Sequence, residues 1–432
     1  MVTIGSTTLP GVQTEVESAS SAGVNVNAAA VVGLVGQADL TNGIAEANEV
    51  YAVTTPVKAR TWFGEGSPLA EGCVDALTEG AYPVYAVAPE RIEVAGEDLS
   101  GLGATSGTLE NTPGPEDPEA YSFSVDSTSK TAVLTTEDPS LKTPGTDEVY
   151  VNPVTGEFEL DSAPSSSGSV DYEYFDYSTA SAALYEKEAS RVDVVGVLNE
   201  NETAVTETHN QALLYDDQYE FTVVIAGAAP NISDTSTFTN SYDSSRIQLL
   251  YPSRNADGQS LVGSYVGLRA RLGINESPIW KRLQTQNDLS ETLSKPDQVN
   301  LVNAKVVPLA DETRGARIVE DLTCVSETNS DEASMQQVLH RLIVDYVTEV
   351  VYVTSERFIG QLHTQAARNA LSSIIGGEMD RLLTQNSITD YNVTVEEVDA
   401  MTASVDVGID TVDPLRNILA TVAAGEVQRA SA

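Results

Sequence analysis

Apolar and polar positions in the first part of the chain change from a strand pattern to a helix pattern and back. Residues 28–36 form a continuous apolar run that ends in glycine, which is typical of a strand covered on both faces. Ser67 and Pro68 then supply an N-cap and a first-turn residue, and apolar positions recur at helical spacing over 69–77. Residues 82–87 return to a strand pattern. Strand, helix and strand in this order predict an α/β layer.

The pattern changes after residue 90. Residues 91–178 are rich in Gly, Pro, Ser, Thr and Asp and contain only short β-like pieces, which predicts a β-rich outer domain inserted into the α/β body. Helix and strand patterns alternate again over 179–330, with strands near 192–198 and 247–251. The insertion is therefore expected to interrupt one α/β core, whose first part is 25–90, without ending it.

A last α/β domain is predicted over 331–414. One amphipathic helix begins at Asp331 and a second spans about 359–385, each with apolar residues on one face. Residues 393–398 and 405–409 alternate apolar and polar positions as strands do.

Both ends of the chain have the pattern of extended arms, over 1–24 and 415–432. A terminal segment of about ten residues buries too little area to order itself unless it pairs with a sheet edge. Donation to a neighbouring copy would link subunits through backbone hydrogen bonds, and the alternative is a strand folded back on its own domain. The residues expected to carry inter-subunit strand exchange are Val2, Thr3, Ile4, Leu9, Val12, Leu415, Ile418, Leu419 and Val422.

The net charge is extreme for a chain with ordinary hydrophobic content. There are 64 acidic and 23 basic residues, a formal net charge of −41, and 41% hydrophobic residues. The acid is therefore expected on the surface of a folded body. Such a body repels its copies at ordinary ionic strength, whereas in about 1 M salt the screening length falls to roughly 3 Å. Life in concentrated brine is the economical interpretation. Nucleic-acid binding, which needs concentrated Lys and Arg, is not expected.

Signatures of enzymes and of membrane proteins are weak or absent. The glycine-rich loop 101–107 lacks the βαβ surroundings of a dinucleotide site, and the three histidines are not at metal-ligand spacing. Carboxylate pairs such as Asp216 and Asp217 are interpreted as solvated surface in so acidic a chain. We predict no catalytic residue, no metal site and no cofactor. With no membrane-length apolar run and no signal-like start, we expect a soluble protein made in the cytoplasm.

Several short motifs, read in order, resemble contractile tail sheath proteins of tailed viruses and related injection devices. Each motif is weak alone, but they are collinear over nearly the whole chain apart from the insertion. The matching stretches are PGVQTE at 10–15, VVGLVGQA at 31–38, LYP at 250–252, VGSYVGLRAR at 262–271 and GAR at 315–317.

This resemblance implies a structural subunit of a sheath-type α/β fold, not an enzyme. Such subunits form a helical homo-oligomer, as stacked hexameric rings, around a tail tube between baseplate and tail terminator proteins. The sheath contracts to drive the tube through the host cell envelope for genome delivery, without nucleotide hydrolysis. The resemblance also implies assembly in the host cytoplasm, localisation in the virion, and a tube-facing final domain. Together with the acidic charge, it predicts a salt-loving, haloarchaeal host. Arg357 and Arg368 are candidate tube contacts, with ordinary surface cations as the alternative.

Two other classes of function stay open on the sequence alone. One is a halophilic cytosolic α/β enzyme with an unrecognised active site, which a bound cofactor or turnover would reveal. The other is a cell-surface lattice protein, for which an export signal would be expected.

Overall fold

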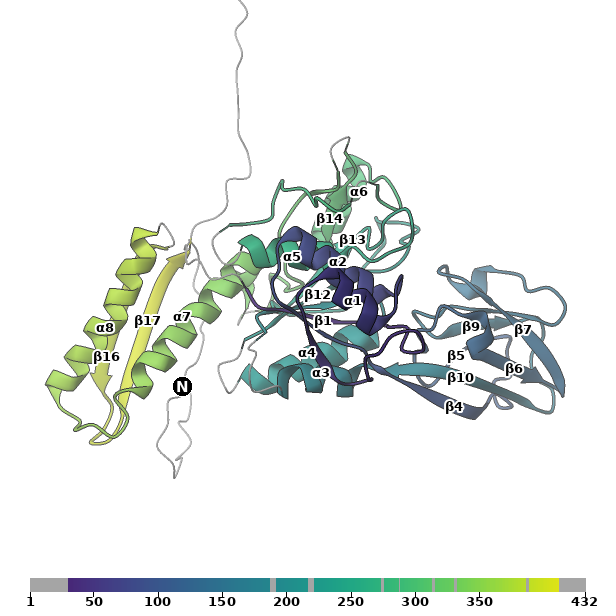
Figure 1. Ribbon diagram of the computed structural model, residues 1–432, viewed down its shortest axis with the longest axis horizontal. Helices are drawn as coiled ribbons and strands as arrows, with labels where there is room; N and C mark the ends of the chain where they lie inside the picture. The colour runs from purple at the N-terminus through teal and green to yellow at the C-terminus, as the bar shows by residue number, and fades with distance from the viewer. Residues whose placement is uncertain are drawn as a thin grey trace, which may run out of the picture.

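The computed structural model describes residues 30–186, 192–216, 221–272, 276–286, 288–312, 315–329, 332–385 and 388–411. Figure 1 shows a central α/β core with a β-rich domain at one end of the long axis and a domain of two helices and a hairpin at the other. Within these described ranges, no helix combines the length and the apolarity needed to cross a membrane.

An eight-stranded sheet forms the centre of the core, and its six inner strands are parallel. The two edge strands, β2 and β15, are antiparallel to their neighbours. Because helices cover both faces, the inner strands are apolar throughout, as the first predicted strand is. In sheet order the strands are β15 (Arg317–Ile318), β14 (Val307–Ala310), β13 (Ile247–Tyr251), β12 (Val223–Gly227), β11 (Val194–Val197), β1 (Val32–Val35), β3 (Val84–Val87) and β2 (Val50–Val53).

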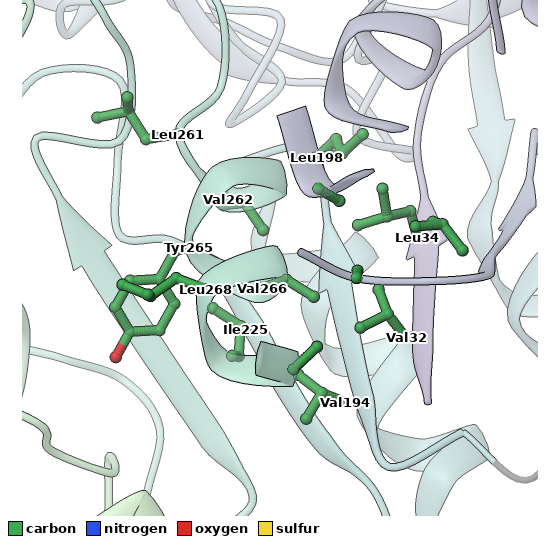
Figure 2. Close-up of a cluster of buried hydrophobic side chains, with 14 of the residues drawn as sticks. Val32, Leu34, Val194, Leu198, Ile225, Leu261, Val262, Tyr265, Val266 and Leu268 are labelled. Carbon is green, nitrogen blue, oxygen red and sulfur yellow. The ribbon is translucent and has the colours of Figure 1, made fainter. Parts of the chain in front are cut away.

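Helices pack against both faces of this sheet. One face carries α1 (Pro56–Phe63), α2 (Pro68–Glu79) and α5 (Val262–Leu272), and the other carries α3 (Tyr177–Glu186), α4 (Glu202–Asp216) and α6 (Lys295–Asn303). Figure 2 shows Val262 and Val266 on the side of α5 that faces Val32 and Leu34 of β1, and a Cβ on Gly196 of the neighbouring β11 would lie 3.0 and 3.1 Å from these two valines. The two faces therefore bury separate apolar clusters on either side of the same strands.

Helices α2 and α5 approach each other unusually closely. Helix α2 begins as predicted, since the Ser67 Oγ accepts a hydrogen bond from the Ala70 backbone N–H and Pro68 occupies the first turn. In α5, a Cβ on Gly267 would lie 2.4 Å from the carbonyl oxygen of Ala76 in α2. Only glycine allows the two backbones to come this near.

The inserted domain is a separate seven-stranded sheet with its own apolar cluster, in which the rings of Phe123 and Phe158 lie 5.4 Å apart. Short 3-10 turns at Pro118–Ala120 and Pro139–Leu141 connect some of its strands. In sheet order the strands are β4 (Glu90–Asp98), β10 (Gly168–Asp176), β6 (Tyr121–Val125), β7 (Thr128–Leu134), β8 (Glu148–Val151), β9 (Glu157–Leu160) and β5 (Ser106–Thr108).

An arginine joins this domain to the core. The Arg254 guanidinium donates to Glu200 of the core at 2.9 Å and to Glu116 of the insertion at 2.7 Å. Its pKa is raised: burial alone would lower it, but the two carboxylates outweigh burial. The Gln37 amide adds a 3.0 Å hydrogen bond to the carbonyl of Gly114.

The C-terminal domain consists of α7 (Val338–Glu356), α8 (Gln365–Thr384), β16 (Ile388–Glu397) and β17 (Ala403–Thr411). The prediction of a helix from Asp331 is wrong at its start, because a 3-10 turn at Ala333–Met335 precedes α7. The second helix begins at Gln365 instead of 359, where the Thr364 hydroxyl accepts from the Ala367 N–H as an N-cap. The predicted mixed α/β fold class is confirmed.

The substitution Gly267→Ala is expected to lower the free energy of unfolding by about 1–3 kcal/mol, because the new methyl group overlaps the backbone of α2. Gly377→Ala in α8 is the matched control. A Cβ at this position meets nothing within 4 Å, and alanine is favoured over glycine inside a helix, so no loss of stability is expected. Thermal unfolding in high salt would compare both variants with the parent. An unchanged midpoint for Gly267→Ala would contradict the close approach of α2 and α5.

Candidate subunit interface

The hairpin of β16 and β17 has one apolar face and one polar face. Alternate residues point toward α7 and α8, and they share one cluster with buried helix residues such as Ile375 and Met379. The facing hairpin residues are Tyr391, Val393, Val395, Val405, Val407 and Ile409. The residues between them, such as Asp406 and Asp410, are exposed. Strand periodicity therefore places a carboxylate-bearing surface on the side away from the helices.

Within the described residues, this sheet has only two strands, so both of its long edges lack a neighbouring strand. The register pairs Tyr391 with Ile409 and Val395 with Val405, and this pairing uses one side of each strand. The outer sides of β16 and β17 therefore present rows of backbone donors and acceptors that can accept further strands. Sheet edges of this kind in a long hairpin are candidate docking sites for extended segments.

The predicted exchange segments lie outside the described residues. Val2, Thr3, Ile4, Leu9 and Val12 precede residue 30, and Leu415, Ile418, Leu419 and Val422 follow residue 411. Their strand exchange stays a prediction. What the structure describes is a sheet with two open edges that such segments could extend.

Helix α7 belongs to two apolar clusters at once. Val338 and Leu342 lie in the cluster of the α/β core, whereas Leu339, Ile343 and Val347 lie in the cluster of the C-terminal domain. One continuous helix therefore runs from the core into the hairpin domain, as Figure 1 shows. The position of the open-edged hairpin relative to the core depends on how α7 is held.

A buried charge network holds α7 against the core. Arg246, next to β13, donates to both carboxylate oxygens of Asp345 in α7, at 3.0 and 3.2 Å, and contacts Asp216 of α4 at 3.0 Å. Arg341 also donates to Asp345, one turn along α7, at 2.9 Å. Arg246, Arg341 and Asp345 are each at least 95% buried. Salt screens buried pairs much less than exposed ones, so this attachment is expected to persist in brine.

The two carboxylates of the network are perturbed in opposite directions. Burial alone would raise the pKa of Asp345, but the charges of Arg246 and Arg341 hold it below its usual value. Asp216 is less well paired, and burial raises its pKa to about 6 despite Arg246. The prediction that Asp216 is solvated surface is wrong, because its side chain is largely covered and pairs with the buried Arg246.

The two candidate tube contacts have different surroundings. Arg357 is exposed in the turn after α7. Arg368 is only 9% exposed and pairs with Glu397 at 2.9 Å, while its guanidinium also contacts the His363 ring at 3.1 Å. Arg368 therefore holds α8 to the end of β16. A role of either arginine in tube binding stays a prediction.

The described residues offer little reactive chemistry. Among them, no group of three His, Cys, Asp or Glu side chains is arranged to hold a metal ion. Cys73 and Cys324 are both buried, and burial raises the pKa of both thiols, to about 12 for Cys324.

Comparisons with known proteins find similarity in structure only. No family model and no curated protein matches the chain. The helical sheath of the anti-feeding prophage in its contracted state matches with a TM-score of 0.58 and 13% identity, over 96% of this chain and 99% of that one. The sheath tail protein of Desulfitobacterium hafniense matches at 0.53 and 13% identity, over 93% and 100%. That of Listeria innocua matches at 0.56 and 12%, over 90% and 94%.

These matches establish the fold of the chain. It is the mixed α/β fold of contractile sheath proteins, and the likeness includes nearly the full length of both partners. The neighbours are structural sheath proteins and not enzymes.

Replacing Arg246 by methionine is expected to destabilise the protein by about 3 kcal/mol, because the buried Asp345 loses one of its two cationic partners. The variant should also expose α7 to limited proteolysis in high salt, where the parent resists. Arg60→Met is a matched control, since the Arg60 pair with Glu71 lies at the surface. Equal proteolysis of Arg246→Met and the parent would contradict the role of this network.

Asp216→Asn is expected to stabilise the protein, by an amount that grows as pH rises. A carboxyl group whose pKa is raised by folding contributes stability that is present below its unfolded pKa of 3.8 and is lost as pH rises through about 6. Asparagine removes this dependence, so the variant should gain stability relative to the parent between about pH 4 and pH 7. Urea unfolding across this range measures the difference. A gap that narrows as pH rises would contradict the assignment.

Proposed function

We propose that this chain is the subunit of a contractile tail sheath. In this proposal the subunits polymerise helically around a tail tube, as stacked hexameric rings between a baseplate and a tail terminator. The sheath contracts to drive the tube through a host cell envelope for genome delivery. The observation that carries the proposal is the structural match to the contracted helical sheath of the anti-feeding prophage, which covers 96% of this chain and 99% of that one.

The hairpin supports a mechanism for linking the subunits. In the part of the chain that the structure describes, the hairpin has two open strand edges, and these can take up extended segments from neighbouring copies. The arms at 1–24 and 415–432 are proposed as those segments, because each can supply a row of backbone donors and acceptors. A head-to-tail contact whose rotation does not close a ring generates a helical polymer.

The charge of the chain supports a setting in concentrated salt. With a formal net charge of −41, copies packed in a polymer would repel one another strongly unless salt screens them. We therefore place the particle in a virion whose host is a salt-loving, haloarchaeal cell, with assembly in the host cytoplasm. The energy for contraction would be stored in the subunit contacts.

Removing residues 1–15 and 415–432 is expected to abolish polymer formation in molar salt while leaving the fold intact. The full-length protein should form sheath-like tubes, visible by electron microscopy, and the truncated protein should sediment as monomers with an unchanged circular dichroism spectrum. A full-length protein that stays monomeric, or a truncated protein that polymerises equally well, would contradict strand exchange.

Point variants separate backbone pairing from side-chain packing in the arms. Ile4→Pro and Ile418→Pro each remove a backbone N–H and should weaken polymerisation strongly if that group pairs with a sheet edge. Ile4→Ala and Ile418→Ala keep the backbone donor and serve as controls. If the proline and alanine variants polymerise alike, the arms do not act through strand pairing.

A further inference from the structure

Two acidic side chains of α2, one helical turn apart, lie at the contact of this helix with α5. Asp75 and Glu79 share a face of α2 because they are four residues apart. The same part of α2 packs closely on α5, where added Cβ atoms on Gly263 and Gly267 would meet its backbone. Asp75 is partly buried, and Glu79 is only 1% exposed. Both carboxyl groups are therefore held at a tight helix contact instead of in solvent.

A chain of side-chain oxygens connects the two carboxyl groups. The Ser264 hydroxyl of α5 lies 3.0 Å from the Asp75 Oδ2, and the Thr285 hydroxyl lies 2.8 Å from the Ser264 Oγ. The Thr285 hydroxyl in turn lies 3.3 Å from the Glu79 Oε1. The first two contacts have the usual length of an O–H···O hydrogen bond, and the third is a longer one. We call Asp75, Ser264, Thr285 and Glu79 the carboxyl chain.

Backbone donors fix the role of Glu79 in the carboxyl chain. The Glu79 Oε1 accepts hydrogen bonds from the backbone N–H groups of Gln284 and Thr285, the latter at 3.0 Å. A backbone N–H can only donate, so this oxygen is an acceptor. The same two bonds attach the segment 284–286 to α2.

An amide fixes the other end of the carboxyl chain. The Gln286 Nε2 donates to the Asp75 Oδ2 at 2.6 Å and to the Ser264 Oγ at 3.0 Å. The orientation of this amide is set by Asn255, whose Nδ2 donates to the Gln286 Oε1 at 3.0 Å. With both amide hydrogens committed, Gln286 has no hydrogen to give to the contact between Ser264 and Thr285.

The number of hydrogens in the carboxyl chain points to a bound proton. Its three oxygen–oxygen contacts need three hydrogens, and the two hydroxyl groups supply two of them. Because Glu79 is an acceptor, the third hydrogen belongs on Asp75, which then donates to Ser264, while Ser264 donates to Thr285. Without this proton, one of the contacts has no hydrogen and places oxygen lone pairs against each other.

The charged groups around Asp75 also favour its neutral form. Glu71 and Glu79 lie one turn away from it on either side along α2, and like charges at this spacing repel. Two nearby cations are directed to those glutamates: Arg60 of α1 pairs with Glu71 at 2.9 Å, and Arg271 of α5 lies 3.9 Å from Glu79. The segment 284–286 has no charged side chain. Among the described residues, no cation pairs with Asp75.

The pKa of Asp75 agrees with this hydrogen count. Burial is the largest cause that raises it, to about 6, and the charges of Glu71 and Glu79 add to the rise. Hydrogen bonds from Ser264 and Gln286 act in the opposite direction but do not cancel it. Near neutral pH, both the protonated and the ionised form of Asp75 are therefore populated.

We propose that Asp75 holds a proton in the carboxyl chain, and that this proton makes the attachment of the segment 284–286 to α2 and α5 depend on pH. With Asp75 protonated, every contact in the chain has its hydrogen and the segment is held. With Asp75 ionised, one hydrogen is missing and the segment opens more often. The switch lies within one copy of the chain, so it does not depend on the proposed sheath function.

Hydrogen exchange of the full-length protein in molar salt measures this attachment. The amides of Gln284 and Thr285 are the reporters, because both donate to Glu79. A carboxyl group whose pKa is raised by folding contributes stability that is present below its unfolded pKa of 3.8 and is lost as pH rises through about 6. From about pH 4 to pH 7, opening of this segment should therefore increase about a hundredfold.

The variant Asp75→Asn cannot titrate and supplies the reference at each pH. The ratio of parent to variant exchange cancels the intrinsic pH dependence of amide exchange, and it should rise about a hundredfold between about pH 4 and pH 7. Asp216→Asn is the matched control, because it removes another carboxyl group with a pKa of about 6, in the α7 network, and should leave the pH dependence at 284–285 as in the parent. A constant ratio for Asp75→Asn, or loss of the pH dependence in Asp216→Asn, would overturn the proposal.

A second variant separates the carboxyl chain from burial alone. Thr285→Val removes the hydroxyl but keeps the backbone N–H, so Ser264 can donate to an ionised Asp75 and no proton is needed. The rise in exchange of the amides at 284 and 285 should then occur at lower pH than in the parent. A rise at the same pH as in the parent would overturn the proposed chain, because burial of Asp75 would then account for it. Circular dichroism confirms that each variant is folded before exchange is measured.

Discussion

The open edges of the β16–β17 hairpin are the constraint around which the molecule is organised. Backbone N–H and C=O groups on an exposed strand need partners, and a two-stranded sheet leaves half of them to water or to other chains. Among the described residues, the hairpin packs against two helices on one face, and no third strand pairs with either of its edges. The sheet is therefore stable enough to present its edges and incomplete enough to accept more strands.

Helix α7 gives this hairpin a defined place. Because α7 contributes to the core cluster and to the C-terminal cluster, the two bodies cannot separate without breaking apolar packing. Arg246, Asp345 and Arg341 add buried ion pairs that bulk salt screens poorly. The surface interactions of so acidic a chain depend on salt. The position of the hairpin domain relative to the core is set by buried contacts that depend on salt much less. At the inserted domain, Arg254 joins a buried carboxylate of the core, Glu200, to an exposed carboxylate of the insertion, Glu116.

Local signals predicted the parts of the fold that depend on local chemistry. The apolar run of β1 and the Ser67–Pro68 start of α2 could be recognised because burial on both faces and helix capping leave marks in adjacent residues. The hairpin strands were recognised only in their apolar centres. β16 begins earlier, at Ile388, and a register shift between Ile388 and Asp390 interrupts its alternation, whereas β17 continues to Thr411, beyond its last large apolar residue. The surroundings of two charged residues could not be predicted for another reason. Asp216 was interpreted as solvated surface, and the burial of Arg368 was not foreseen. Their partners, Arg246 and Glu397, are brought together by tertiary folding, and spacing along the chain does not reveal them.

A cryo-electron microscopy map of the assembled particle tests the account most directly. The account predicts that β16 and β17 are flanked by strands contributed by the terminal segments of neighbouring copies, so that one continuous sheet contains more than one chain. A map in which both terminal segments pack on their own body, with the hairpin edges facing solvent, would contradict it.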